Sequence, residues 1–271
     1  GWAARIDRDP VVAMSQGSAQ SLLFASALIL FWVMPLIAWL LLKDQRDLPA
    51  RLWFGGAAAY AVTASIFVAD RLFPVWLLTN VSWAFAALMV LLFIESMRIE
   101  LGDKRARWRL VFGLIALNLL LSVGLEMAGA SFDVMRSAQL VFMSSIEVVL
   151  ARYMWAVIRR RRSRALIVVL LIVLIVIANN AMRVLQHLVV GQGVALADGT
   201  LLANLSFLIN FVSVVFYSFG YWGFVIEKGR ADLSQSSEER ALAREAEGRA
   251  LDRERVSLEL VRERDELIAQ L

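Results

Sequence analysis

The sequence of 271 residues contains no cysteine, a single histidine and only four prolines. Without cysteine, disulfide bonds, thiolate nucleophiles and thiolate metal sites are excluded. The single histidine, His187, excludes a haem held by two histidines of one chain. The only lysines are Lys43, Lys104 and Lys228, which border the apolar segments, so no buried lysine is available for a retinal Schiff base. We expect no catalytic site, no cofactor and no metal site in this chain.

Charge is also scarce, and this scarcity has a clear pattern. Charged residues make up 19% of the chain and hydrophobic residues 60%, with a mean hydropathy of +0.67. The charges gather between apolar runs and at the C-terminal end, as in a polytopic membrane protein. The net charge of +4 therefore does not predict nucleic-acid binding, because most of the excess lies in short loops, where it sets topology.

Seven apolar runs approach the roughly 20 helical residues that a bilayer core of about 30 Å requires. Helices are expected because a lipid-exposed backbone must satisfy its own hydrogen bonds. The sequence therefore predicts an all-α fold, a seven-transmembrane-helix bundle followed by a cytoplasmic coiled-coil helix. The predicted spans are Ser21–Leu42, Arg51–Ala69, Phe73–Met97, Trp108–Met127, Val134–Ile158, Ala165–Leu188 and Leu201–Ile226.

The distribution of basic residues predicts the direction of these spans. Lysine and arginine gather after the first span, between the third and fourth, and between the fifth and sixth, where residues 159–162 are all arginine. The positive-inside rule then places the N-terminus outside and the C-terminus in the cytoplasm. We expect a multi-pass protein of the bacterial inner membrane. Its predicted parts are an extracytoplasmic segment (1–20), a transmembrane sensor domain (21–226) and a cytoplasmic signalling helix (227–271).

Polar side chains lie inside the predicted spans, mostly in the outer halves of spans three to seven. Such groups are costly in a bilayer and usually face the bundle interior. Asn180, Arg183 and His187 are spaced by three and four residues and share one helix face. One interpretation is a pocket for a small ligand; the other is a structural network in which Arg183 pairs with Glu126 or Glu147. The candidate ligand-binding residues are Arg183, Asn180, His187, Asn179, Glu147, Gln139, Glu126, Asn210 and Asn80.

Other residues near span ends have simpler interpretations. Most of the tryptophans and tyrosines there are expected to form interfacial belts. These residues are Trp53, Trp76, Trp108, Tyr153, Trp155, Tyr221 and Trp222. Arg152 and Glu95 are expected to form an ion pair at the cytoplasmic ends of two spans.

The last forty or so residues are rich in Ala, Leu, Glu and Arg and lack proline. Two apolar stripes compete along them, one through Leu242 and Val256 and one through Leu251 and Leu258. Two rival seams predict a switchable two-stranded coiled coil and therefore a homodimer. A single solvated helix is the alternative. The predicted dimerisation and relay residues are Leu242, Val256, Leu260, Leu267 and Leu271.

Two stretches resemble the N-terminal seven-span sensor region of bacterial sensor histidine kinases or diguanylate cyclases. One begins with the loop 41–53 and continues through residues 93–102; the other is the tail 263–271, which is similar to the signalling helix before a phosphotransfer domain. The resemblance implies a following output domain, a histidine kinase first of all, and a response regulator as its partner. The phosphoacceptor motif of such kinases is absent, so this chain itself is expected to be non-catalytic.

These observations predict a membrane receptor module that detects an extracytoplasmic or membrane-borne signal in bacterial two-component signal transduction. The expected partners are the lipid bilayer, an unknown small ligand and a second copy of the chain, but no nucleic acid. The alternative is a small membrane transporter or channel whose tail serves assembly. Transport has no positive signal here, because only Pro35 lies well inside a span and an odd number of spans gives no simple inverted repeat.

Overall fold

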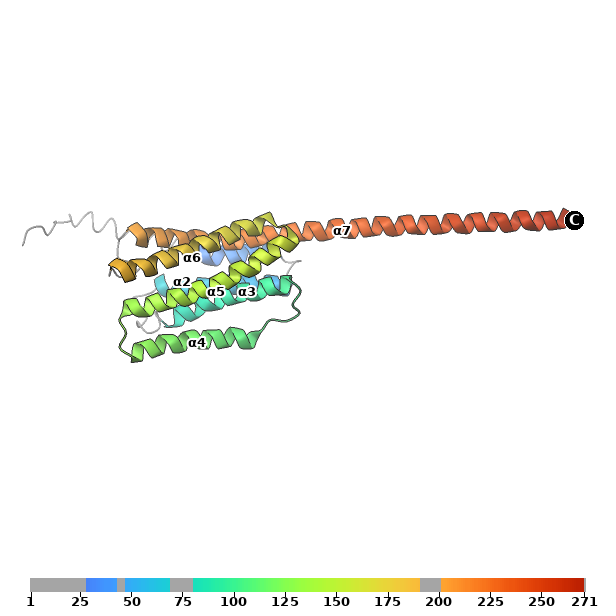
Figure 1. Ribbon diagram of the computed structural model, residues 1–271. Coiled ribbons are helices and arrows are strands. Elements are labelled where there is room, and N and C mark those ends of the chain that lie inside the picture. Colours follow the sequence, from blue (N-terminus) through green and yellow to red (C-terminus); the bar gives the residue numbers. More distant parts are fainter. Residues whose placement is uncertain (1–27, 43–46, 69–79, 191–200, 271) are drawn as a thin grey trace, which may run out of the picture. The chain divides into compact units, whose positions relative to one another are not determined.

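The computed structural model describes residues 28–42, 47–68, 80–190 and 201–270 (Figure 1). Nearly all of these residues are helical and none of them lies in a β-strand, so the predicted all-α class is confirmed. The helices are Leu28–Leu41, α2 (Leu48–Val68), α3 (Ser82–Glu100), α4 (Trp108–Met127), α5 (Phe132–Arg161), α6 (Arg164–Val190) and α7 (Leu201–Gln270).

Five of the described helices are long and apolar enough to cross a membrane. They are α3, α4, α5, most of α6 and a segment of α7 that begins at Leu208. The chain is therefore a membrane protein. Leu28–Leu41 is apolar but shorter, and α2 is not among the five, so the count of seven spans stays a prediction.

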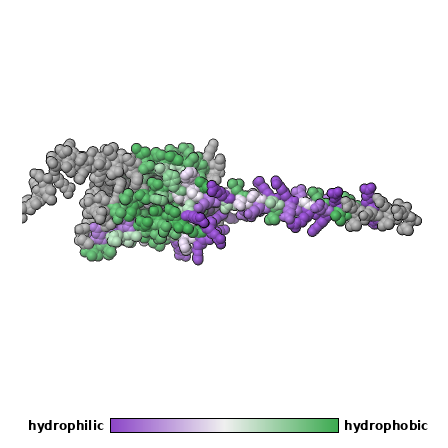
Figure 2. Space-filling model, turned by 90° about the horizontal axis from the view of Figure 1, so that it is seen from above, coloured by the Kyte–Doolittle hydropathy of each residue, from purple (hydrophilic) through white to green (hydrophobic). Residues whose placement is uncertain are grey.

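Consecutive helices from α2 to α6 pack side by side. α3 packs against α2 and α5, and α5 packs against α6. α4 packs mainly on α3 and α5 at one edge of the bundle (Figure 1). Its exposed leucines and Phe112, 61% exposed, suit contact with lipid chains. Figure 2 shows hydrophilic residues gathered at one end of these apolar helices.

The centre of the bundle is an aromatic stack of Trp53, Phe93 and Tyr221. The Trp53 ring lies 3.9 Å from that of Phe93 and 4.4 Å from that of Tyr221 by ring centroids, nearly parallel to both. Trp53 also donates from Nε1 to the carbonyl oxygen of Tyr217 at 3.2 Å. The stack therefore fixes α7 against α2 and α3. Trp53 and Tyr221 are fully buried and therefore do not belong to a lipid-facing belt, whereas Trp155 is 52% exposed.

Three glycines allow close helix approach in this core. A Cβ on Gly220 of α7 would lie 2.1 Å from Val169 Cγ2 of α6, and one on Gly223 would lie 2.9 Å from Ala165 Cβ. A Cβ on Gly56 of α2 would lie 2.7 Å from the Phe93 ring. These contacts bring α6 and α7, and α2 and α3, closer than any larger residue would allow.

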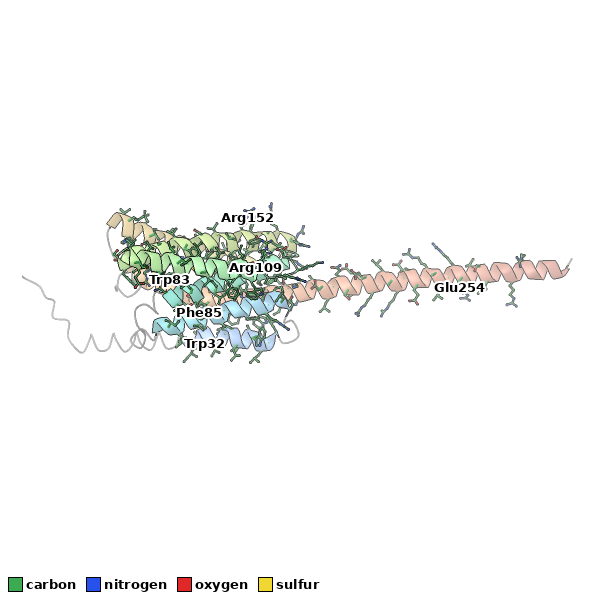
Figure 3. The ribbon with its side chains drawn as sticks, turned by 90° about the horizontal axis from the view of Figure 1, so that it is seen from below. Trp32, Trp83, Phe85, Arg109, Arg152 and Glu254 are labelled. Carbon is green, nitrogen blue, oxygen red and sulfur yellow. The ribbon has the colours of Figure 1, made fainter. Side chains whose placement is uncertain are left out.

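The chain divides into two compact units, one through Val225 and one from Ile226. Within the second unit, the side chains of α7 project on all sides of the helix, as Figure 3 shows around Glu254. Leu242 and Val256 of the predicted relay are 65% and 55% exposed. The side chains of Leu260 and Leu267, and residue Leu271, lie outside the described part. The coiled coil stays a prediction.

Candidate functional site

The first link of the candidate site joins α5 to α6. Glu147, near the middle of α5, is only 5% exposed. Asn180 of α6, also buried, donates from Nδ2 to Glu147 Oε2 at 3.3 Å. Burying a carboxyl group inside an apolar helix bundle has a large desolvation cost. A buried polar pair of this kind is therefore a candidate functional site.

The second link joins α6 to α7. Ser206 of α7 is fully buried and donates from Oγ to Asn179 Oδ1 at 2.8 Å. The amide nitrogen of Asn179, Nδ2, is buried and has no hydrogen-bond partner among the described residues. Asn210, half-buried one turn further along α7, donates to the carbonyl oxygen of Ser206 at 2.8 Å. The adjacent amides Asn179 and Asn180 therefore connect α6 to two different neighbours.

A third link joins α4 to α5. Gln139 donates from Nε2 to Ser122 Oγ at 2.7 Å, and both side chains are buried. Asn118 lies one turn before Ser122 on α4 and is 1% exposed. Its Oδ1 has no hydrogen-bond partner in the described part of the chain. The guanidinium of Arg136, one turn before Gln139, lies 5.6 Å from the centroid of the Phe132 ring.

The remaining predicted residues differ in their surroundings. Arg183 is buried, one turn after Asn180 on α6, and Asn80 is buried just before α3. His187 is half-buried. Glu126 is exposed near the end of α4. The burial of Arg183 and Asn180 agrees with the shared helix face that their spacing indicates.

We call Glu147, Asn179, Asn180, Arg183 and Ser206 the polar cluster. It combines a carboxyl group, a guanidinium, two amides and a hydroxyl in a bundle whose other buried residues are mostly apolar. Such a set can bind a small polar ligand through paired donors and acceptors, or it can hold helices together. Among the described residues, no group of three or more His, Asp or Glu could hold a metal ion.

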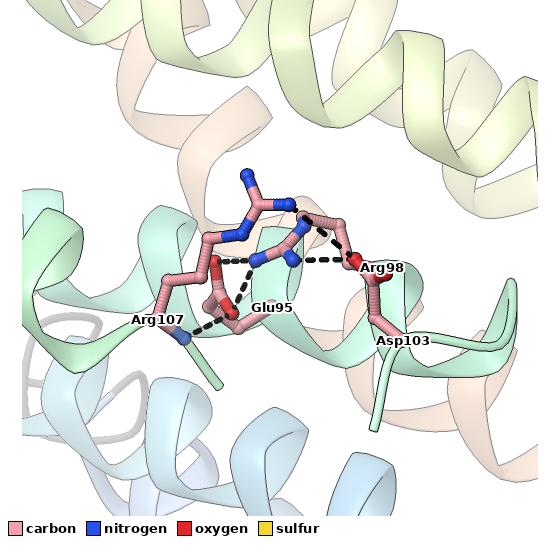
Figure 4. A network of polar contacts seen from close by, with 4 residues as sticks. All are labelled: Glu95, Arg98, Asp103 and Arg107. Atoms are coloured by element: carbon pink, nitrogen blue, oxygen red, sulfur yellow. Dashed lines mark hydrogen bonds and ion pairs between the residues drawn. The ribbon is translucent and has the colours of Figure 1, made fainter. Parts of the chain in front are cut away.

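A charged network that the sequence reasoning missed lies where α3 leads into α4. Glu95, 1% exposed, accepts hydrogen bonds from Arg98 Nη1 at 2.5 and 2.7 Å and from the backbone N–H of Arg107 at 2.8 Å (Figure 4). Arg98 also pairs with Asp103. The predicted Arg152–Glu95 pair is wrong, because Glu95 is engaged by Arg98 and Arg152 is exposed. The i,i+3 spacing of Glu95 and Arg98 was the signal that could have identified the network.

No protein-family model, curated protein or solved structure matches this chain.

Proposed function

We propose that this chain is a membrane sensor module: the polar cluster detects a signal, and α7 relays it to a dimeric helix that controls a C-terminal output domain. The observation that carries this proposal is the position of α7. It contributes Ser206 to the polar cluster, Tyr221 to the aromatic stack, and then continues as helix to Gln270. α7 is therefore one continuous helix that belongs to both units.

The composition of the polar cluster supports binding over a purely structural role. Helix association in a bilayer needs only small residues and a few interhelical hydrogen bonds. The cluster goes further, since it buries both an acidic and a basic side chain, Glu147 and Arg183. It also leaves Asn179 Nδ2 without a hydrogen-bond partner among the described residues. A buried amide nitrogen in that state is a donor that a ligand or a water molecule could satisfy.

The packing of α7 supports a relay by displacement of the helix. Between Ser206 and the end of the first unit, α7 contacts α2 and α3 through Tyr217 and Tyr221 and approaches α6 closely at Gly220. Close-packed interiors do not deform continuously, so a change at one end of such a helix is carried along it. In this proposal, a ligand that pulls on Ser206 shifts or rotates α7 against the aromatic stack.

The second unit supplies the proposed readout. Leu242 and Val256 are fourteen residues apart and share one helix face, while Leu251 lies about 180° from Leu242 at 100° per residue. Leu251 and Leu258 are 61% and 62% exposed, like the first pair. Both seams are thus available to a second copy of the chain. A shift of α7 would exchange one seam for the other and so change the arrangement of the output domains.

The proposed topology places this helix in the cytoplasm of a bacterium, as the basic loops indicate. The proposed output is a histidine kinase that acts on a response regulator, as the resemblance of residues 263–271 to a signalling helix implies.

Disulfide crosslinking tests the proposal, since the natural chain has no cysteine. Val256→Cys reports the first seam and Leu258→Cys the second; Ala241→Cys, about 100° before Leu242, is the off-seam control. In membrane vesicles, at least one seam should crosslink between copies well above the control. If neither seam exceeds Ala241→Cys, the dimeric relay is refuted.

The transport alternative is separated by a flux measurement. A transporter would move its substrate across proteoliposome membranes, and the movement would be lost in Arg183→Ala or Glu147→Ala. A sensor should leave ion and solute leakage unchanged in the same variants.

A further inference from the structure

We propose that one end of the bundle binds the phosphate groups of anionic phospholipids. The surface is made by residues 104–109, which lead into α4, and residues 159–164, which end α5 and begin α6. The first segment has four basic residues and the second has five, and neither contains an acidic residue. We call these two segments the basic patch.

The fold brings the two segments of the basic patch together. Arg160 donates from Nη1 to the carbonyl oxygen of Leu101 at 2.5 Å, a contact across 59 positions of sequence. A Cβ on the neighbouring Gly102 would lie 3.8 Å from the same Arg160 nitrogen. Leu101 and Gly102 lie just before the first segment, so this contact holds the two basic segments at the same end of the bundle.

Two of the nearby acidic groups are already engaged by an arginine of α3. Glu95 is buried against Arg98, and Asp103 is also paired with Arg98. Asp103 approaches one residue of the patch, Arg107, at 3.9 Å. Lys104, Arg105, Arg109 and Arg164 are exposed, and their charge can meet an anion.

The chemistry of the basic patch suits phosphate. All but one of its basic residues are arginines, and the planar guanidinium donates two parallel hydrogen bonds to phosphate oxygens. Arg162 takes a left-handed backbone conformation, with φ of 53°, that glycine adopts more easily. Arg109 and Arg164 lie in the first turns of α4 and α6, where the helix dipole favours a negative charge. The positions of Arg109 and Arg164 are therefore poor for helix stability and good for anion binding.

Apolar neighbours favour a lipid over a dissolved anion. Trp108 and Trp155 are 46% and 52% exposed at the patch, and the Arg159 guanidinium lies 5.8 Å from the centroid of the Trp155 ring. The next turn of α4 exposes Phe112. Charged groups beside exposed indole rings and an apolar helix face match a headgroup with its acyl chains.

The test is fluorescence quenching in vesicles. A bimane label is attached to Ala106→Cys in the basic patch, or to Ala130→Cys beyond the other end of α4, in the otherwise intact chain. The vesicles are phosphatidylcholine with a minor fraction of brominated phosphatidylglycerol or brominated phosphatidylcholine. At Ala106→Cys, we expect brominated phosphatidylglycerol to quench the label about five times as strongly as brominated phosphatidylcholine. At Ala130→Cys, the two lipids should quench equally. The preference at Ala106→Cys should fall as the salt concentration rises.

Charge variants test whether the basic patch causes the preference for brominated phosphatidylglycerol. Combined Arg105→Gln, Arg109→Gln and Arg164→Gln should reduce it to about twofold or less. Arg240→Gln, Arg244→Gln and Arg253→Gln, the matched change in the second unit, should leave it intact.

Four results would overturn the proposal. They are equal quenching by the two lipids at Ala106→Cys, an equal preference at Ala130→Cys, a preference that survives the patch variant, and a preference that inorganic phosphate abolishes at constant ionic strength. The first three exclude the patch as a lipid site, and the last assigns it to a soluble anion. The comparisons of salt concentration and of label position use no charge variant. They therefore test the lipid-binding proposal even if the triple variant does not fold.

Discussion

Replacement of Gly220 by alanine should destabilise the bundle, although alanine is the better helix former. The added Cβ would lie 2.1 Å from Val169 Cγ2 on α6, far inside van der Waals contact. Val169 is fully buried, and a β-branched side chain in a helix has one strongly preferred rotamer. Turning this methyl group out of its preferred rotamer costs energy in a close-packed core, so we expect α6 and α7 to separate.

The size of the effect follows from two opposing terms. Overpacking a close-packed core costs about 1–3 kcal/mol. Alanine in place of glycine inside a helix stabilises the helix by about 1 kcal/mol or less. The net loss of unfolding free energy should therefore be about 1–2 kcal/mol.

The measurement is unfolding of the detergent-solubilised chain with increasing dodecyl sulfate, followed by tryptophan fluorescence. Gly124→Ala in α4 is the matched control, because a Cβ there would meet nothing within 4 Å. It should raise stability slightly. Adding Val169→Ala to Gly220→Ala should recover part of the loss. If Gly220→Ala proves as stable as Gly124→Ala, α6 and α7 do not pack as described.

Two further predictions concern buried groups, each with an exposed counterpart. Glu95→Gln should lower the unfolding free energy by about 2–4 kcal/mol, since it removes a buried partner of Arg98. Glu245→Gln, which removes an exposed pair, should change it by about 0.5 kcal/mol or less; similar losses in the same dodecyl sulfate titration would contradict the buried network. Trp53→Ala should cost about 3–5 kcal/mol through loss of the aromatic stack, and Trp155→Ala about 1 kcal/mol or less. Circular dichroism melts should separate the tryptophan variants.

Several helices could be predicted from sequence because their apolar runs are about as long as a membrane span requires. The apolar run 108–127 predicts α4 at both ends, and the runs 134–158 and 165–188 lie inside α5 and α6. The ends that extend further are those with charged residues, such as the arginines that finish α5. A helix already formed continues into water until a residue such as Arg162 leaves the helical conformation.

The partners of individual side chains could not be predicted in the same way. The position of Trp53 near a span end favoured an interfacial belt, but burial depends on what the other helices supply. Here Gly56, one turn away on α2, lets Phe93 approach, and Tyr221 arrives from α7, more than 160 residues away. The sequence predicts how far along a helix a residue lies, whereas the direction that its side chain faces depends on the helices packed beside it.

A last pair of variants separates a structural role of the polar cluster from a sensory one. Asn180→Ala removes the donor to Glu147, and interhelical hydrogen bonds in membranes contribute only about 1 kcal/mol. Glu147→Gln keeps the shape of the side chain and an acceptor oxygen but removes any negative charge. Both variants should therefore retain the folded bundle, with losses within about 1 kcal/mol in the dodecyl sulfate titration.

The crosslinking readout then decides between the two roles. A cluster that only holds α5, α6 and α7 together has no reason to affect the second unit once the bundle is folded. A sensory cluster sets the position of α7, so Glu147→Gln should change the ratio of Val256→Cys to Leu258→Cys crosslinking at unchanged stability. Ser145→Ala, on an exposed turn of α5, should leave the ratio as it is. If both cluster variants keep their stability and the wild-type crosslinking ratio, the polar cluster has only a structural role. The proposal that it detects the signal would then be refuted.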